Sequence, residues 1–240
     1  MSALSTQQCD LLRRAAACYE QAALLADACR LYQRLDDPLP EARLQERLGL
    51  PQAAAAAYRR AGAWNDAARC LLQCGDAAGA AACLEQAGQP MEAAWVLADR
   101  ARRPTRARAL VAVLDSPSPL QQMEIELIQI RCAAEAGERD AAPRLRRTIA
   151  RIGEASLPPL AAARLLAWAS AIAARLRRPD LTILGHAAAL AAGIPQALPA
   201  WEQWSSAVLG DTSGVPQTPG DRDPAAAEDT PATASASLSP

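Results

Sequence analysis

A period of thirteen residues governs the first half of the sequence. Four glycines, Gly49, Gly62, Gly75 and Gly88, lie thirteen residues apart, and the residues between them align in columns. Such spacing is typical of a chain built from small repeated units, each of which buries its apolar side against its neighbours. Cutting the chain at residue 10 and at every thirteenth residue thereafter gives eight units, the last of which ends at Val113.

The columns of this alignment separate small, apolar and variable positions. Column seven holds alanine or cysteine in every unit, from Ala16 to Ala107, and column six holds alanine in six of the eight units. Column nine is apolar throughout, and column ten is mostly tyrosine or leucine. Columns three, six, seven, ten and thirteen have the i, i+3, i+4, i+7 spacing of one helix face. Each unit therefore predicts one helix of about ten residues, followed by a tight turn.

The glycine and proline positions agree with this prediction. Column one is the glycine column, and glycine is favoured just past a helix end because positive φ costs it little. Pro38, Pro51 and Pro90 share column three, where the first turn of a helix tolerates a missing N–H. Helices this short need a neighbour to cover their apolar face. We therefore expect antiparallel hairpins of 26 residues that stack into a solenoid through their small residues.

Three segments carry a family resemblance: residues 18–22 (CYEQA), 57–62 (AYRRAG) and 83–88 (CLEQAG). They resemble the repeated alanine, tyrosine and glycine phrase of tetratricopeptide-like solenoids, in the short-hairpin variety of SNAP-type adaptors and coat-protein helical arms. The likeness covers residues 10–113 but not the 34-residue tetratricopeptide signature, because the period here is 26. It implies an all-α, right-handed solenoid that acts as a protein-interaction scaffold, a class with no catalytic residues to transfer.

Longer helical patterns follow residue 113, where the register breaks down. We expect Asp180 to cap a helix, and Gly137, Gly153 and Gly193 to stop helices. The expected helices, which continue or cap the solenoid, cover residues 119–136, 140–152, 157–177, 180–192 and 196–209. The predicted organisation is a lead-in at 1–9, short repeats at 10–113, longer hairpins at 114–210, and a disordered tail at 211–240 that is poor in large apolar residues.

Composition places the chain among soluble globular proteins. Of its 240 residues, 51% are apolar and 21% are charged, and all 25 basic residues are arginine. The arginine bias and the abundance of alanine indicate a GC-rich bacterial genome. The chain has no signal-peptide pattern, no apolar run long enough for a membrane span, and seven cysteines without regular pairing. We therefore expect a cytoplasmic protein with free thiols.

Few residues offer catalytic or metal-binding chemistry. His186 is the only histidine and lies in an ordinary helical context, which leaves at most one Ser–His or Cys–His pair. No nucleotide-binding or hydrolase motif is present. Cys70, Cys74 and Cys83 fall in columns of the apolar face, where cysteine behaves as a small hydrophobe rather than a zinc ligand. We predict no catalytic activity, no cofactor, no metal and no small-molecule substrate.

Arginines between residues 100 and 178 give the strongest charge signal. The formal charge is −2 over residues 1–97, +5 over 98–210 and −4 over 211–240. The basic region is either a solvated face, partly neutralised by the acidic tail, or a surface for nucleic acid or an acidic partner. Column eight is mostly polar or small and should face outward, so Trp95 there is either an exposed contact residue or packed against the next hairpin. The candidate partner contacts are Gln52, Arg69, Trp95, Arg102, Arg103, Arg106 and Arg108.

Two functions follow from these patterns. The favoured one is a non-catalytic scaffold or adaptor that binds a partner protein or peptide on the solenoid groove, within a larger bacterial assembly. The alternative is a nucleic-acid-associated module that uses the arginine-rich residues 100–178. A steep salt dependence of binding is expected of the second function only.

Overall fold

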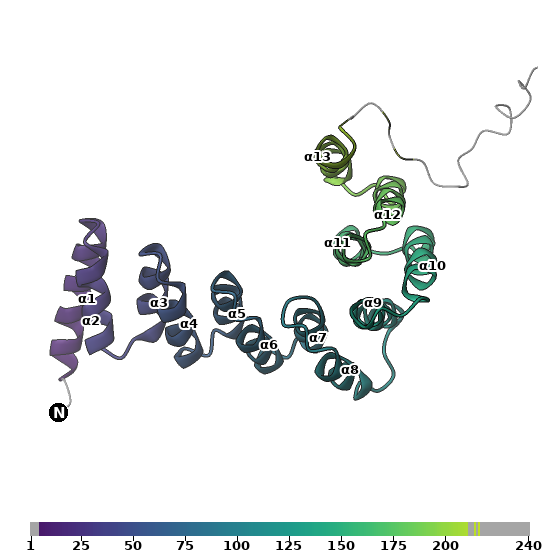
Figure 1. The fold of residues 1–240 in the computed structure, drawn as a ribbon. Coiled ribbons are helices and arrows are strands. Elements are labelled where there is room, and N and C mark those ends of the chain that lie inside the picture. The colour runs from purple at the N-terminus through teal and green to yellow at the C-terminus, as the bar shows by residue number, and fades with distance from the viewer. Residues whose placement is uncertain (1–4, 211–213, 215, 217–240) are drawn as a thin grey trace, which may run out of the picture. The chain divides into compact units, whose positions relative to one another are not determined.

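The computed structural model describes residues 5–210, 214 and 216. Within them the secondary structure is entirely α-helical, with thirteen helices and no strand (Figure 1). The chain divides into two compact units, residues 1–138 and residues 139–240. The tail predicted for residues 211–240 lies outside the described residues, apart from Gly214 and Pro216.

Nine helices form the first unit. The six helices from α2 to α7 are each ten residues long and begin thirteen residues apart. Each packs against the helix before it and the helix after it, so the predicted repeat of short helices is confirmed. In chain order the helices are α1 (Thr6–Gln21), α2 (Leu25–Arg34), α3 (Pro38–Arg47), α4 (Pro51–Arg60), α5 (Trp64–Gln73), α6 (Ala77–Gln86), α7 (Pro90–Asp99), α8 (Pro104–Ala112) and α9 (Pro119–Ala136).

Burial in the first unit follows the columns. Column seven is buried in all eight repeats, from Ala16 to Ala107. Column nine is buried from Leu44 to Val96 but exposed at Cys18 and Ala109, near the ends of the repeat array. Because the buried residues are small, neighbouring helix backbones approach closely, and each short helix buries its apolar face against its neighbours.

The turns also repeat, until the last unit. Gly49, Gly62, Gly75 and Gly88 have φ between 71° and 79°, as column one predicts for glycine past a helix end. In the eighth repeat the positive φ falls on Arg102 rather than on column one, and α8 begins at Pro104 in column four. This one-residue slip explains why Arg106 in column six is exposed, whereas the other residues of that column are wholly or partly buried.

The first helix is longer than the ten residues that the period predicts. It has 16 residues because a capping box at Ser5 starts it inside the expected lead-in. The Ser5 hydroxyl accepts a hydrogen bond from the Gln8 amide at 3.2 Å, and the Gln8 side chain accepts one from the Ser5 amide at 2.9 Å. These two bonds satisfy amides that a helix start otherwise leaves without partners.

Helix α9 closes the first unit by packing on α7 and α8. Its bounds match the prediction. Ser118 forms a second capping box at the start of the helix, and Gly137 ends it with φ of 73°. The Arg131 side chain, only 3% exposed, fixes α9 to the end of α7: its Nε donates to Asp99 at 2.9 Å, and one terminal nitrogen donates to Glu135 at 3.0 Å.

Four longer helices form the second unit: α10 (Ala141–Glu154), α11 (Pro159–Arg175), α12 (Pro179–Ala191) and α13 (Ala197–Leu209). Helices α10, α11 and α12 pack against one another, and α13 packs against α12. Their buried side chains include Leu145, Ile149, Leu165, Ile172 and Leu181. The second unit thus has its own apolar core.

Two predicted helix ends in the second unit are wrong. Gly153 does not stop α10 but lies inside it, where a Cβ would come within 3.3 Å of the Ala188 Cβ on α12. Its lack of a side chain therefore serves helix packing rather than a turn. Asp180 is not the N-cap of α12, because Pro179 takes the first helical position and leaves the cap to Arg178.

Candidate functional site

The predicted contact residues are spread over the first unit. Column eight is exposed at every position except Trp95, which is partly buried. Arg69 donates to Glu46 at 3.0 Å and to Asp66 at 3.1 Å. Arg106 pairs with Glu85 at 2.8 Å, and Arg108 pairs with Glu138 at 3.2 Å. These three arginines therefore use their charge within the protein.

The remaining candidates, apart from Trp95, lie at helix starts. Gln52 is the second residue of α4 and is exposed; it falls in column four of the repeat. Arg102 occupies the turn before α8, and Arg103 is the N-cap residue of that helix. Both arginines are exposed, and neither forms an ion pair with any residue that the structure describes. The structure does not gather the seven candidates into one site.

A groove on the first unit brings together residues that were not among these candidates. It has a volume of about 290 Å³ and is lined by Arg59 at the end of α4, Trp64 at the start of α5, and Ala82, Cys83 and Gln86 on α6. Ala82 is the column-eight residue of its repeat and is exposed, so its small side chain leaves room on the outer face of α6. We call this feature the α4–α6 groove.

Arg59 and its neighbour Arg60 have different roles. Arg60 pairs with the buried carboxylate of Glu41, and with Asp36 at 3.4 Å. Arg59 is exposed and forms no ion pair with the residues that the structure describes. A guanidinium in this position is available to a carboxylate from another molecule.

Trp64 supplies the aromatic wall of the α4–α6 groove. It is partly buried and begins α5, at a column-three position that other repeats fill with proline, leucine, alanine or arginine. That departure is the signal in the sequence that points to this groove. The Cys83 thiol nearby is buried, and burial raises its pKa, so it stays protonated near neutral pH and contributes an apolar surface.

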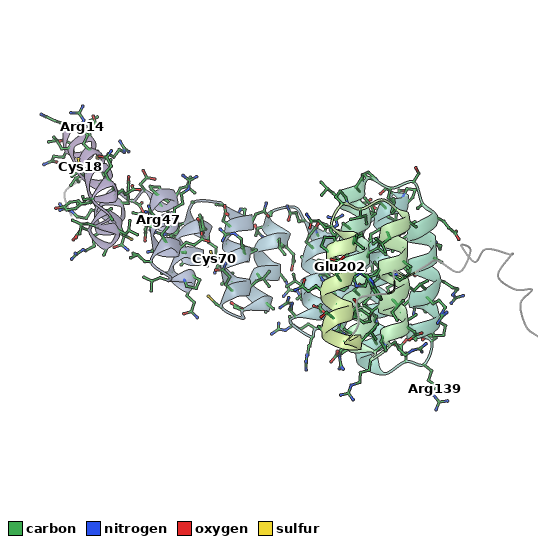
Figure 2. All side chains as sticks on the ribbon, turned by 90° about the horizontal axis from the view of Figure 1, so that it is seen from above. Arg14, Cys18, Arg47, Cys70, Arg139 and Glu202 are labelled. Atoms are coloured by element: carbon green, nitrogen blue, oxygen red, sulfur yellow. The ribbon has the colours of Figure 1, made fainter. Side chains whose placement is uncertain are left out.

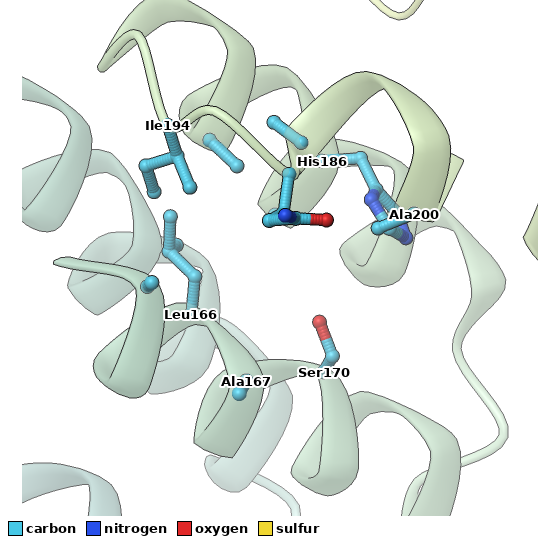
Figure 3. A pocket seen from close by; sticks show the side chains of 11 residues that line it. Leu166, Ala167, Ser170, His186, Ile194 and Ala200 are labelled. Atoms are coloured by element: carbon cyan, nitrogen blue, oxygen red, sulfur yellow. The ribbon is translucent and has the colours of Figure 1, made fainter. Parts of the chain in front are cut away.

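The second unit contains a small apolar pocket that includes the only histidine. It has a volume of about 210 Å³, and its lining residues include Leu166, Ile194, Ser170 and His186 (Figure 3). The Ser170 hydroxyl points into the pocket. The structure therefore places a serine and the histidine at one cavity.

The surroundings of His186 are aromatic. Its ring lies 5.6 Å from the Trp201 ring and 5.7 Å from the Trp204 ring, measured between centroids. Burial lowers the pKa of the imidazole, so His186 is neutral at pH 7. The residues that line the pocket include no carboxylate, so none of them can orient the imidazole as the third member of a triad does.

Cysteine is the remaining residue type that could offer metal-binding chemistry. Within the described part of the chain, no group of three or more histidine, cysteine, aspartate or glutamate residues is arranged to hold a metal ion. Cys70 is buried, as is Cys83, and burial raises the pKa of its thiol. Both cysteines therefore pack as small apolar side chains within their columns.

Comparison of the chain with family models, with curated proteins and with solved structures finds no match. The architecture itself establishes that the chain is an all-α helical repeat protein whose short helices pack in neighbouring pairs. Among the residues that the structure describes, no helix is both long enough and apolar enough to cross a membrane.

Proposed function

We propose that this chain is a non-catalytic interaction scaffold of the tetratricopeptide-like kind, and that its α4–α6 groove binds a segment of a partner protein. Stacked short hairpins leave extended outer faces, which repeat proteins use for binding. The first unit buries its small columns and exposes column eight. Its surface is therefore built from regularly spaced helix faces, one of which is hollowed at Ala82.

The observation that carries the proposal is that Arg59 and Trp64 both line this groove. Tryptophan and arginine are enriched among the residues that dominate binding energy at protein interfaces. An arginine without an internal acidic partner favours a carboxylate, and the tryptophan ring favours an apolar side chain. The expected ligand is a peptide segment in which an acidic residue lies next to an apolar one.

The nucleic-acid alternative has weaker support. It relies on the arginines between residues 100 and 178, but Arg106, Arg108 and Arg131 all pair with carboxylates of the first unit. In the second unit, Arg146 and Arg178 share Asp180. Internal pairing removes much of the positive charge that phosphate binding requires.

The proposal is tested by affinity purification from a lysate of the source organism. The bait is the intact chain, the variant Arg59→Glu/Trp64→Ala, or the control variant Arg43→Glu on the exposed column-eight position of α3. Each is run with and without nuclease, after circular dichroism has shown equal helix content. We expect a protein partner that the intact chain and the control retain after nuclease treatment and that the groove variant loses. Recovery that collapses with nuclease would instead support nucleic-acid binding.

A further inference from the structure

Three arginines of the second unit line a hollow of about 510 Å³. Arg146 and Arg147 project from the first half of α10, Arg178 is the N-cap residue of α12, and Ala142 and Pro143 complete the lining. We call this feature the arginine hollow. It lies within one compact unit and is separate from the α4–α6 groove.

One carboxylate already lies at the arginine hollow. Asp180 accepts hydrogen bonds from Arg178 at 2.8 and 2.7 Å and from Arg146 at 3.0 Å. The hydrogen bonds from Arg178 lower the pKa of Asp180, as expected for a carboxylate beside guanidinium groups. Arg147 is exposed and forms no ion pair with the described residues. Three guanidinium groups thus face one carboxylate, so the arginine hollow keeps an excess of positive charge.

The formal charge of the second unit is also unbalanced. Its two parts, residues 139–210 and 211–240, have opposite signs. Residues 139–210 contain nine arginines and four acidic residues, a formal charge of +5. Residues 211–240 contain one arginine and five acidic residues, a formal charge of −4. Four of those five acidic residues lie close together, at Asp221, Asp223, Glu228 and Asp229. With Arg222 among them, residues 221–229 carry a formal charge of −3, opposite in sign to the +5 of residues 139–210.

The topology places the end of α13 and the starts of α10 and α12 at the same end of the unit. Helices α10, α11 and α12 pack through short connections, so α10 and α12 run parallel and their starts lie together. Helix α13 packs on α12 after a turn of five residues and runs back, so that it ends near the start of α12. Arg139, which precedes α10, marks this end in Figure 2. Helix α13 therefore ends at the same end of the unit as the arginine hollow.

The chain after Gly210 is also long enough to reach the arginine hollow. Residues 221–229 follow Gly210 by 11 to 19 positions, and a coil of that length spans roughly 17–26 Å. Packed helices lie about 8–10 Å apart, so the hollow beside α12 is within about 20 Å of the end of α13. A tether of this length gives an effective concentration on the order of millimolar, so weak ion pairs suffice for docking.

We propose that the acidic segment 221–229 docks in the arginine hollow of the same chain. Its carboxylates accept hydrogen bonds from Arg147 and from the outer N–H groups of Arg146 and Arg178. Docking covers the arginine hollow and keeps other anions from it. The proposal is independent of the function proposed for the α4–α6 groove, because it concerns only residues of the second unit.

The absence of lysine from the sequence permits a direct test. The variant Arg147→Lys introduces a single side-chain amine, which a carbodiimide joins to any carboxylate in contact with it. Coupled peptides of the purified, nuclease-treated full chain are identified by mass spectrometry. The matched control is Arg43→Lys, an exposed position on the first unit. A mixture of light and ¹⁵N-labelled chains separates coupling within one chain from coupling between chains.

We expect Lys at position 147 to couple to residues 221–229 of its own chain, several-fold more than Lys at position 43. That coupling should fall as salt rises from about 0.05 to about 0.5 M, because exposed ion pairs are screened. Replacing the four acidic residues with Asn or Gln should abolish it. Equal coupling from the two lysines, coupling only to Asp180, or coupling only between chains would overturn the proposal. The proposal would also be overturned if residues 221–229 did not couple and if nucleic acid copurified with the intact chain but not with Arg147→Glu.

Discussion

The Tyr58 hydroxyl donates a hydrogen bond to the Glu46 carboxylate at 3.0 Å, and the same carboxylate pairs with Arg69 on α5. Glu46 thereby joins α3, α4 and α5. The tyrosine–glutamate bond recurs 26 residues earlier, where Tyr32 donates to Glu20 at 2.8 Å. Arg47, from a different repeat position than Arg69, lies 3.9 Å from Glu20. One glutamate in each of the first two hairpins thus connects three consecutive helices, and a polar contact repeats with the period of the fold.

The hydrogen bond from Tyr58 should contribute measurably to stability. Tyr58 is 3% exposed, and hydrogen bonds to charged groups contribute about 1.5–3 kcal/mol when they are well formed. We expect Tyr58→Phe to lower the free energy of unfolding of the first unit by about 1–2 kcal/mol. Urea denaturation followed by circular dichroism measures this change. Tyr19→Phe is the control, because Tyr19 is 39% exposed, and it should change stability by less than about 0.5 kcal/mol.

The ion pair at Glu46 predicts a dependence of stability on pH. The hydrogen bond from Arg69 lowers the pKa of Glu46 below its ordinary value of 4.5. A lowered pKa in the folded state means that the stabilisation is complete above pH 4.5 and is lost as pH falls through the folded-state pKa. The stability difference between the wild type and Glu46→Gln should therefore be largest near neutral pH and shrink in acid. A difference that stays constant from pH 7 to pH 3 would show that Glu46 acts without its charge.

Substitution of the buried arginine of α9, Arg131, should lower the free energy of unfolding more than substitution of any exposed arginine. Arg131 pairs with both Asp99 and Glu135, which themselves remain about one-fifth exposed. Breaking a fully buried pair costs about 3–5 kcal/mol, and the partial exposure of both acids reduces this. We expect Arg131→Met to lower the free energy of unfolding of the first unit by about 2–4 kcal/mol. The matched variant Arg43→Met, at an exposed position, should leave it within about 0.5 kcal/mol.

The close approach of α10 and α12 at Gly153 predicts an overpacking effect. A Cβ at Gly153 would lie 3.3 Å from the Ala188 Cβ, so a larger side chain has no space. We expect Gly153→Leu to lower the free energy of unfolding of the second unit by about 1–3 kcal/mol. Thermal unfolding followed by circular dichroism should show this as a lower midpoint. Ala150→Leu, on the exposed side of the same helix, should have little effect. Equal thermal midpoints for the two variants would contradict the close packing of α10 and α12 at Gly153.

The repeat helices could be predicted because each one carries its own local signals. Glycine in column one and proline in column three recur at fixed spacing, and column seven is small throughout. The bounds predicted for the helix at residues 119–136 are confirmed, and Gly137 ends it as expected. These features depend on neighbours within a few positions, which a sequence displays directly.

Features that depend on distant partners could not be predicted. Arg59 and Arg60 are equivalent in the sequence, and only the fold brings Glu41 and Asp36 to Arg60 while leaving Arg59 at the groove. Glu41 interrupts an alanine column, yet it is buried, because Gln45 donates to it at 2.8 Å and Gln33 at 3.2 Å. Gly153 looks like a helix stop until α12 is placed against it. The α4–α6 groove also depends on distant partners and could not be predicted. Its one signal in the sequence is Trp64, a tryptophan in column three.

The central claim is that the chain binds a protein partner through the α4–α6 groove. Hydrogen–deuterium exchange of the full chain, with and without the partner recovered by affinity purification, tests this claim most directly. We predict that the partner slows exchange in the peptides that contain Arg59 and Trp64 and in those of α6 around Ala82 and Gln86. The variant Arg59→Glu/Trp64→Ala should lose this protection. Protection confined to residues 139–210, with none in α4 to α6, would contradict the account.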